Sequence, residues 1–331
     1  MIRNNLPGEA LDSRLGRPLV RVALTSTISR LPNRMLEALR ETYARSTPGT
    51  LREQVFGAAL EVVRHIGIPA TVESFQVDSR PPLLLTAGDS LVLQRLYWFG
   101  ARGWEPALAR WWRECVEHAS SVAELGANVG YYTALAGAAR RDLHYIAVEP
   151  HPVSVAILKR NLLLNGVEAS QIVEAAAVHD ERQLVELLVP QVDHFAAPAG
   201  AFVGDASELE QRHTVTLTVT AISFREVVED ADLVKLDVEG QEYQLLHSAQ
   251  EILMRNRAVL VIELLDDAQL LRAFVRDVCE QHSYVAVQPT MDSLRVIPVA
   301  SLGTTRVVDR MGTRDILVLP AEHPLAARAV S

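Results

Sequence analysis

The stretch that decides the fold is residues 122–132, which read VAELGANVGYY. An apolar strand runs into a turn with two glycines, and a helical pattern follows over 129–139. Glycines between a strand and a helix let the backbone approach a ligand closely at the carboxyl edge of a parallel sheet. The stretch therefore predicts the first strand and the ligand-binding loop of a Rossmann-like α/β domain.

The spacing of the glycines excludes one common ligand of such loops. A dinucleotide site would need glycine at 128 and 131, where this chain has Asn128 and Tyr131, whose side chains would crowd a pyrophosphate. An acid two residues before Gly126 and a second glycine, Gly130, four residues after it match the E-x-G-x-x-x-G pattern of S-adenosylmethionine sites. The loop backbone can hold the amino-acid end of that ligand, and Glu124 supplies negative charge nearby. A glycine-rich turn with no ligand is the alternative.

A second acid is expected beside this loop. The strand over 144–149 ends in Glu149, 19 residues after Gly130, and Pro150 follows. This places the carboxylate at the neighbouring strand tip, where it can accept hydrogen bonds from both ribose hydroxyls. Capping of the helix that starts at Pro152 is the alternative role. The residues predicted to bind the cofactor are Glu124, Gly126, Asn128, Gly130, Tyr131, Glu149 and Pro150.

Strands and helices alternate along the chain from residue 120. The expected strands are 120–125, 144–149, 171–178, 232–237, 258–264, 283–288 and 314–319. The expected helices are 129–139, 151–165, 223–229, 240–255 and 266–281. Pro152 in a first turn and a capping box from Ser223 to Glu226 support two of the helix starts. This alternation predicts a parallel sheet covered by helices on both faces.

Two further segments lie outside the alternation. Residues 183–189 and 213–220 are expected to form an added hairpin. The loop between them, 190–212, contains His194 and is a candidate lid over the substrate.

Residues 1–115 are predicted to form a mixed α+β extension of the domain at 116–331. Residues 1–30 show no period. The expected helices are one over 33–45, one that begins at a Thr50–Glu53 capping box and runs to Ile66, and a short one from about Asp89. The expected strands are 71–77 and 82–86, joined by a turn at 78–82.

The composition of the chain bounds its partners. The 331 residues carry a net charge of -9, whereas a general nucleic-acid binder needs a basic face. Cys115 and Cys279 fit neither a disulfide framework nor a metal-ligand spacing, and buried packing is expected for both. No apolar run is long enough for a membrane span, and the start lacks the apolar core of a signal peptide. We therefore expect a cytoplasmic protein with no nucleic-acid or membrane partner.

The fourth strand and the turn after it, residues 232–242, read DLVKLDVEGQE. With the glycine loop, this segment resembles the FkbM family of methyltransferases, which has a G-A-N-x-G loop and a K-x-D-x-E-G strand end. Both are present, at 126–130 and 235–240. The segment 103–106 is similar to the family's entry segment, although Trp104 replaces the more usual tyrosine and Glu124 a commoner aspartate. The resemblance covers roughly residues 85–290.

The resemblance implies a class I S-adenosylmethionine-dependent methyltransferase that methylates a hydroxyl of a natural product or a saccharide. The predicted catalytic residues are Asp237, Glu239 and Lys235. Asp237 is expected at the junction of cofactor and acceptor, and Glu239 is expected to orient or deprotonate the hydroxyl. Lys235 has an alternative role as a structural partner of either acid.

Other interpretations stay open at this point. Glu263 ends the fifth strand and could face the substrate, cap a helix or share a divalent cation with Asp237, although no ligand cluster supports a metal site. His179 and His247 are positioned where a base could lie, but a lone histidine is more often structural. A nicotinamide-dependent dehydrogenase and a catalytically silent binding module are the competing functions. A homodimer through the N-terminal region is a further expectation.

Overall fold

The structure is a computed structural model that describes residues 33–64, 67–77, 82–168, 170–190, 195–204, 214–307 and 314–330. Its centre is a nine-stranded sheet with the order β15-β13-β12-β14-β11-β10-β3-β4-β5. The strands are β3 (Ser121–Leu125), β4 (His144–Val148), β5 (Ser170–Val173), β10 (Leu233–Leu236), β11 (Val259–Glu263), β12 (Tyr284–Pro289), β13 (Leu294–Val296), β14 (Asp315–Pro320) and β15 (Ala329–Val330). The five strands from β11 to β5 are parallel, and β14, β12 and β13 add antiparallel pairs. The predicted α/β class is confirmed.

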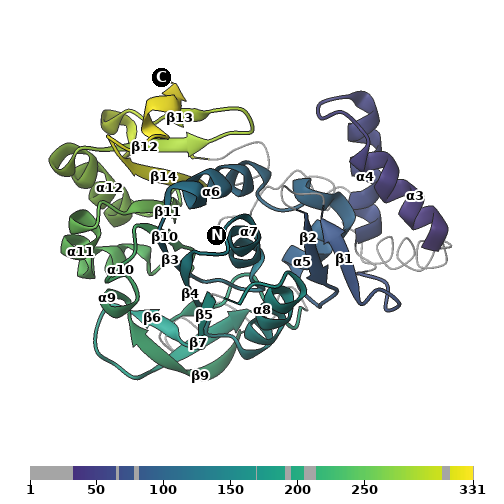
Figure 1. The fold of residues 1–331 in the computed structure, drawn as a ribbon, viewed down its shortest axis with the longest axis horizontal. Coiled ribbons are helices and arrows are strands. Elements are labelled where there is room, and N and C mark those ends of the chain that lie inside the picture. Colours follow the sequence, from purple (N-terminus) through teal and green to yellow (C-terminus); the bar gives the residue numbers. More distant parts are fainter. Residues whose placement is uncertain are drawn as a thin grey trace.

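Helices cover both faces of this sheet (Figure 1). One face packs against α6 (Pro106–His118), α7 (Tyr131–Ala139) and α8 (Pro152–Leu164). The other packs against α9 (Phe224–Val227), α10 (Glu242–Ser248), α11 (Gln250–Arg255) and α12 (Gln269–His282). Alternate residues of each strand enter the two cores, so Val259 and Val261 join one and Leu260 and Ile262 the other.

The same alternation decides where two charged residues of the site point. Leu233 and Val122 belong to the core beneath α6 and α7. Lys235 and Glu124, each two residues further along its strand, therefore point to that face. They are also direct partners in the parallel pairing of β10 with β3. A buried lysine and a buried glutamate are thus placed side by side beneath α7.

The predicted hairpin is present as part of a smaller sheet with the order β6-β9-β7-β8. Its strands are β6 (Ala176–Val178), β7 (Leu184–Pro190), β8 (Phe202–Val203) and β9 (Thr214–Ser223). The strand predicted over 171–178 is wrong as one element. The chain leaves the central sheet after Val173, and Ala176 starts a strand that pairs with β9 instead. A run of apolar residues does not show which sheet each half joins.

The N-terminal extension packs against α8 through two asparagines. It comprises α3 (Asn33–Ala44), α4 (Leu51–Val63), the antiparallel pair β1 (Ser74–Val77) and β2 (Leu83–Thr86), and α5 (Leu91–Phe99). The Asn165 side chain exchanges two hydrogen bonds with the backbone of Leu84, and Asn161 Oδ1 accepts from Thr86 N at 2.8 Å. These contacts satisfy an edge of β2 that would otherwise face a helix unpaired.

Several predicted boundaries differ from the structure. The helix expected over 240–255 is two helices, α10 and α11, separated at Ala249. Thr50 caps α4 as predicted, but Glu53 accepts from Gly49 N rather than from Thr50 N. Ser223 makes no side-chain cap, so the second capping box is wrong. Helix α6 and strands β8, β13 and β15 were not predicted.

The predictions for residues 1–30, Ile66, the turn at 78–81, His194 and most of the 190–212 loop lie outside the described residues. Cys115 and Cys279 are buried, as expected. Within the parts of the chain that the structure describes, no helix has the length and apolar character needed to cross a membrane.

Candidate active site

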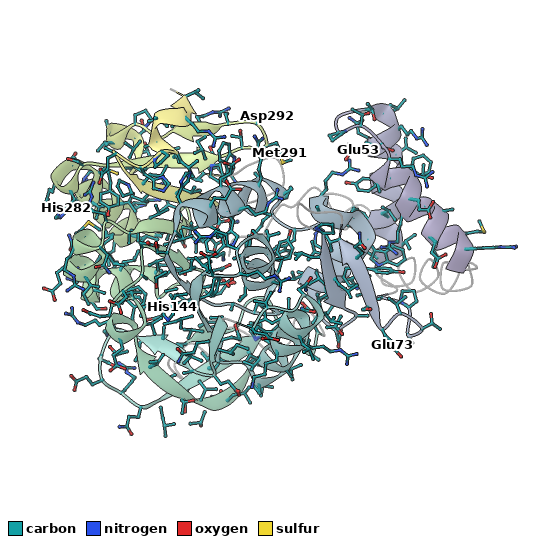
Figure 2. All side chains as sticks on the ribbon, viewed as in Figure 1. Glu53, Glu73, His144, His282, Met291 and Asp292 are labelled. Atoms are coloured by element: carbon teal, nitrogen blue, oxygen red, sulfur yellow. The ribbon has the colours of Figure 1, made fainter. Side chains whose placement is uncertain are left out.

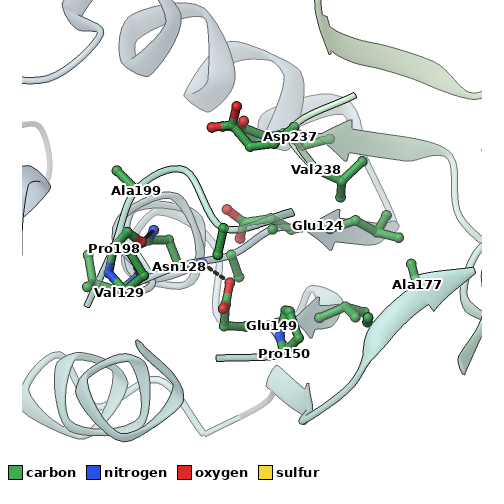
Figure 3. A pocket seen from close by; sticks show the side chains of 18 of the residues that line it. Glu124, Asn128, Val129, Glu149, Pro150, Ala177, Pro198, Ala199, Asp237 and Val238 are labelled. Carbon is green, nitrogen blue, oxygen red and sulfur yellow. Dashed lines mark hydrogen bonds and ion pairs between the residues drawn. The ribbon is translucent and has the colours of Figure 1, made fainter. Parts of the chain in front are cut away.

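A cavity lies at the carboxyl ends of β3, β4 and β10, and its volume is about 910 Å³ when its open mouth is included. Figure 3 shows Glu124, Glu149 and Asp237 around it, with Pro198 and Ala199 beside Asn128. The residues that line it and that the sequence predicted are Glu124, Gly126, Asn128, Tyr131, Glu149, Pro150, Lys235, Asp237 and Glu239. Strand tips that are distant in sequence therefore meet at one site.

At each glycine of the loop, a neighbouring chain segment lies too close for a Cβ atom. Gly126 has a φ of +79°, and a Cβ atom there would lie 1.9 Å from the backbone oxygen of Asp237. Gly130 has a φ of +76°, and its Cβ would lie 2.8 Å from Cγ of Leu158 on α8. Gly126 lines the cavity, whereas Gly130 is not among the lining residues. The second glycine is explained by the packing of α7 on α8.

Asn128 connects three parts of the site. Its backbone N–H donates to Glu149 Oε2 at 2.8 Å, and its Nδ2 donates to the carbonyl oxygen of Pro198 at 2.9 Å. Its Oδ1 accepts from Val129 N at 2.7 Å. The residue adopts a φ of +49°, a conformation that asparagine tolerates better than most residues. Both polar atoms of its side chain are thus engaged with protein groups, and one of the two N–H donors of Nδ2 is used in this way.

Glu149 is held at the tip of β4 by backbone amides. Oε2 accepts from Asn128 N and Oε1 from His151 N, each at 2.8 Å. Burial raises the pKa of Glu149 to about 7, although the two amide hydrogen bonds act in the opposite direction. A carboxylate has about four acceptor sites, so two remain for a ligand.

Glu124 and Lys235 form the floor of the cavity. Glu124 Oε2 accepts from Thr133 Oγ1 at 2.6 Å and from the Tyr145 hydroxyl at 2.5 Å. Burial raises the pKa of Glu124 even though Lys235 lies beside it. The expected acid is therefore present at the loop, and two hydroxyl donors already bind one of its oxygens.

Lys235 is 1% exposed and its Nζ lies 3.0 Å from Asp237 Oδ2. The ammonium also stands 4.9 Å from the centre of the Tyr132 ring. Burial alone would lower the pKa of Lys235, but the carboxylates around it, Asp237 first among them, raise it. Lys235 is thus a permanent cation that holds Asp237 in place, which agrees with the structural alternative named for it.

The turn after β10 places the two predicted catalytic acids. The Asp237 side chain is 32% exposed and faces the cavity. Glu239 lines the cavity from a residue with a φ of +57°. Glu242 stabilises this turn, because its carboxylate accepts from the backbone N–H groups of Val238 and Gly240 at 3.0–3.2 Å.

Glu263 is not among the lining residues. It is the direct partner of Asp315 in the pairing of β11 with β14, and Arg314 Nη1 lies 3.9 Å from its Oε1. Burial and the nearby acids, Asp237 above all, raise the pKa of Glu263 to about 9. In the described ranges no three His, Cys, Asp or Glu side chains are arranged to hold a metal ion. Nor do His179 and His247 line the cavity.

Several lining residues were not predicted as site residues. Val92 and Trp104 come from the extension, Ala175 to Ala177 and Leu187 from the segments after β5, and Gln241 from the turn after Glu239. A short segment within 195–204 also lines the cavity, and the rest of the lining comes from residues next to the predicted ones: Leu125, Ala127, Val129, Tyr132, Val148 and Val238. Three signals for these residues were present in the sequence: Trp104 is in the entry segment, Gln241 directly follows the strand-end motif, and residues 195–204 belong to the loop named as a candidate lid.

Residues 124–285 match the family model of the methyltransferase FkbM domain. The chain contains an FkbM methyltransferase domain. The match begins at Glu124 and includes both motifs that carried the resemblance, at 126–130 and 235–240. The predicted family is confirmed, and the methyl donor of the domain is S-adenosylmethionine, as the glycine loop predicted.

Solved structures with a similar arrangement include the methyltransferase FkbM from Methylobacillus flagellatus KT, with 13% identity and a TM-score of 0.37 over 60% of this chain and 43% of that one. This chain thus spans less than half of the Methylobacillus protein. Another is an O-methyltransferase from Bacillus cereus in complex with SAH, with 13% identity and a TM-score of 0.35 over 65% of this chain and 81% of that one. No curated protein matches the chain significantly.

The residues of the FkbM domain fit the cofactor. Glu149 keeps two acceptor sites for a pair of hydroxyls. Asp237 and Glu124 line the same cavity, where an ionised carboxylate would attract a sulfonium. Ala175, Ala177 and Leu187 give the cavity an apolar portion suited to a flat ring.

Proposed function

We propose that the FkbM domain is an S-adenosylmethionine-dependent O-methyltransferase that acts on a hydroxyl of a natural product or a saccharide. One observation carries the proposal. Glu149, which keeps two acceptor sites, and Asp237, which is partly exposed, line a single cavity. The first suits a ribose and the second an acceptor hydroxyl, so donor and acceptor can be held together.

When bound, the cofactor supplies a methyl group that is already activated by its sulfonium. The protein then has to align the acceptor oxygen with that methyl and receive the hydroxyl proton. Asp237 is the group proposed to take the proton, since its carboxylate faces the cavity and Lys235 holds it at 3.0 Å. Glu239 and Gln241 also line this side and can orient a polyhydroxyl acceptor.

Asp237→Asn tests the chemical step. The amide keeps the size of the side chain but is a far weaker base, so kcat should fall by about 10²–10⁴-fold. Affinity for S-adenosylmethionine, measured by calorimetry, should fall by no more than about tenfold, because the ribose site is intact and only one charge near the sulfonium is lost. The acceptor is to be found by mass spectrometry of a panel of hydroxyl compounds incubated with the cofactor. Turnover by the variant at the wild-type rate would remove Asp237 from the chemistry.

Calorimetry on the wild-type protein also separates the competing functions. Binding of S-adenosylmethionine without binding of NAD is the expected result. Binding of NAD alone would reverse the assignment, and binding of the cofactor with no methylated product from any acceptor would favour the silent binding module.

Glu149→Ala should weaken the binding of S-adenosylmethionine by about 2–4 kcal/mol, because charge-assisted hydrogen bonds to both hydroxyls are lost. In the wild-type protein the affinity should also rise with pH. The pKa of Glu149 is about 7, and only the ionised carboxylate accepts from both hydroxyls. Affinity at pH 6 should therefore be about tenfold below that at pH 8.

The expected rise of cofactor affinity with pH does not come from a higher folding stability at high pH. Burial makes the pKa of Glu149 higher in the folded than in the unfolded chain, so its ionisation lowers folding stability as the pH rises through about 7. Glu149→Gln should bind more weakly than wild type at pH 8 and lose the pH dependence. A Gln variant that keeps the wild-type pH profile would assign the titration to another group, with Glu124 the next candidate.

A further inference from the structure

A short segment, residues 195–204, covers one side of the cavity. Pro198, Ala199, Ala201 and Val203 line the cavity from it. Figure 3 shows Pro198 and Ala199 next to Asn128, at one side of the cavity. Glu149 and Asp237 lie on two other sides that face each other. A ligand in this cavity would therefore lie beneath backbone that belongs to neither of the domain's motifs.

One end of the segment is anchored on the N-terminal extension. Asp89 Oδ2 accepts from Ala196 N at 3.1 Å, and the Asp89 carbonyl accepts from Ala197 N at 3.0 Å. Ser90 and Ala197 form an isolated parallel bridge, and Ala197 is fully buried. Asp89 itself is exposed and precedes the start of the family match at residue 124. The anchor is thus supplied from outside the matched domain.

Two side chains hold the segment over the cavity. Asn128 Nδ2 donates to the carbonyl of Pro198 at 2.9 Å, and Gln241 Nε2 donates to the carbonyl of Val203 at 3.3 Å. Asn128 comes from the loop whose amide binds Glu149, and Gln241 from the turn that follows Glu239. The two donors thus belong to residues that also line the cavity, Asn128 on the side of the proposed cofactor and Gln241 on the side of the proposed acceptor.

The middle of the segment has only small side chains to keep it closed. Residues 196–201 read AAPAGA. Beyond them strand β8 pairs with β7, Gly204 N donates to the Glu186 carbonyl at 3.3 Å, and Val203 packs against a small apolar cluster. Small side chains bury little apolar surface, so a few hydrogen bonds carry most of the closure. Such segments open more readily than packed elements.

We propose that residues 195–204 form a strap that must lift for S-adenosylmethionine to enter or leave, and that Asp89 is the positioning residue that keeps the strap closed. The inference rests on the proposed function only in naming the ligand. Asn128 links the strap to the ribose acid through its two hydrogen bonds. A bound cofactor and a closed strap therefore stabilise each other.

The test compares cofactor exchange in full-length wild-type protein and in Asp89→Ala. Stopped-flow fluorescence of the tryptophans, one of which, Trp104, lines the cavity, reports binding of S-adenosylmethionine and of S-adenosylhomocysteine. The dissociation rate should rise about tenfold when the charged acceptor at the anchor is lost. Hydrogen exchange at Ala196 and Ala197 should speed up as well. Gln241→Ala should increase the dissociation rate from the other end of the strap.

Two controls keep the result specific. Asp89→Asn retains a side-chain oxygen as acceptor and should recover most of the slow dissociation. Asp292→Ala removes an exposed acid in the turn between β12 and β13, at the periphery of the molecule (Figure 2), and should exchange cofactor as wild type does. Dissociation and hydrogen exchange that are unchanged in Asp89→Ala would overturn the strap. Failure of the wild-type protein to bind either ligand would instead overturn the proposed function, and hydrogen exchange would still test the strap.

Discussion

Replacing Lys235 with methionine is expected to lower the free energy of unfolding by about 3–5 kcal/mol at pH 8. The side chain is 1% exposed, so its charge was removed from water on folding. Four carboxyl groups interact with it, those of Asp237, Asp315, Glu105 and Glu124. Methionine fills a similar volume but leaves these acids without their shared cation. Denaturation by urea at fixed pH measures the difference.

The size of this loss should depend on pH in a definite direction. Burial raises the pKa values of Glu124 and Asp315, and Lys235 opposes both rises. Without the lysine these pKa values rise further, so the acids can become neutral at moderately low pH. A group whose pKa is higher in the folded state adds stability at low pH and loses it as the pH rises. The deficit of Lys235→Met should therefore be smaller at pH 5.5 than at pH 8.

The chain offers a matched control, because it contains only two lysines, Lys159 and Lys235. Lys159 forms an ion pair with Glu174, and both side chains are more than half exposed. Lys159→Met should change the free energy of unfolding by less than about 1 kcal/mol. Equal effects of the two substitutions would show that Lys235 does not hold the buried acids together.

The parts of the site that sequence predicted are those set by strand order. The glycine loop, Glu149 and Asp237 each directly follow a short apolar strand, and the carboxyl ends of parallel strands meet at one edge of a sheet. Side chains alternate between the two faces of β10, so Lys235 points to the same face as Leu233. Knowing that the strand ends at Leu236 shows that this rule stops before Asp237. That end was the uncertain point, since Asp237 and Glu239 would share the face of Lys235 only if the strand continued.

The remaining features depend on contacts between distant segments. Nothing near Gly130 indicates that Leu158 will pack against it. The strap was expected only as part of a long candidate lid, since its hydrogen bonds come from Asp89, Asn128 and Gln241. The sequence likewise gives no sign that the chain leaves the central sheet after β5. In each case the local pattern is compatible with several partners, and tertiary packing selects one.

Gly126→Ala is expected to weaken cofactor binding by at least about 100-fold and to destabilise the fold by about 2–5 kcal/mol. Two costs add. The φ of +79° is unfavourable for alanine by about 1–2 kcal/mol. The new Cβ would lie 1.9 Å from the backbone oxygen of Asp237, so the loop or the end of β10 has to move, at a further cost of about 1–3 kcal/mol. Calorimetry and urea denaturation measure the two effects.

Gly49→Ala separates the two costs. Gly49 has a φ of +81°, but nothing lies within 4 Å of its Cβ position. Its substitution should cost only the conformational part, about 1–2 kcal/mol, and leave cofactor affinity unchanged. The difference between the two variants then measures the contact of Gly126 with Asp237. If the two lose equal stability and both bind the cofactor normally, the close approach is not a constraint on the site.

The contact also predicts how activity should fail. Because Gly126 lies against the backbone of Asp237, any shift that makes room for alanine displaces both the cofactor loop and the proposed base. Gly126→Ala should therefore reduce kcat at saturating cofactor as well as cofactor affinity, since misplacement of a reacting group by about 1 Å can cost about 100-fold. Glu149→Ala should act mainly on affinity, because Glu149 is held by Asn128 and His151 rather than by β10. A loss of affinity alone in Gly126→Ala would place the movement entirely in the loop.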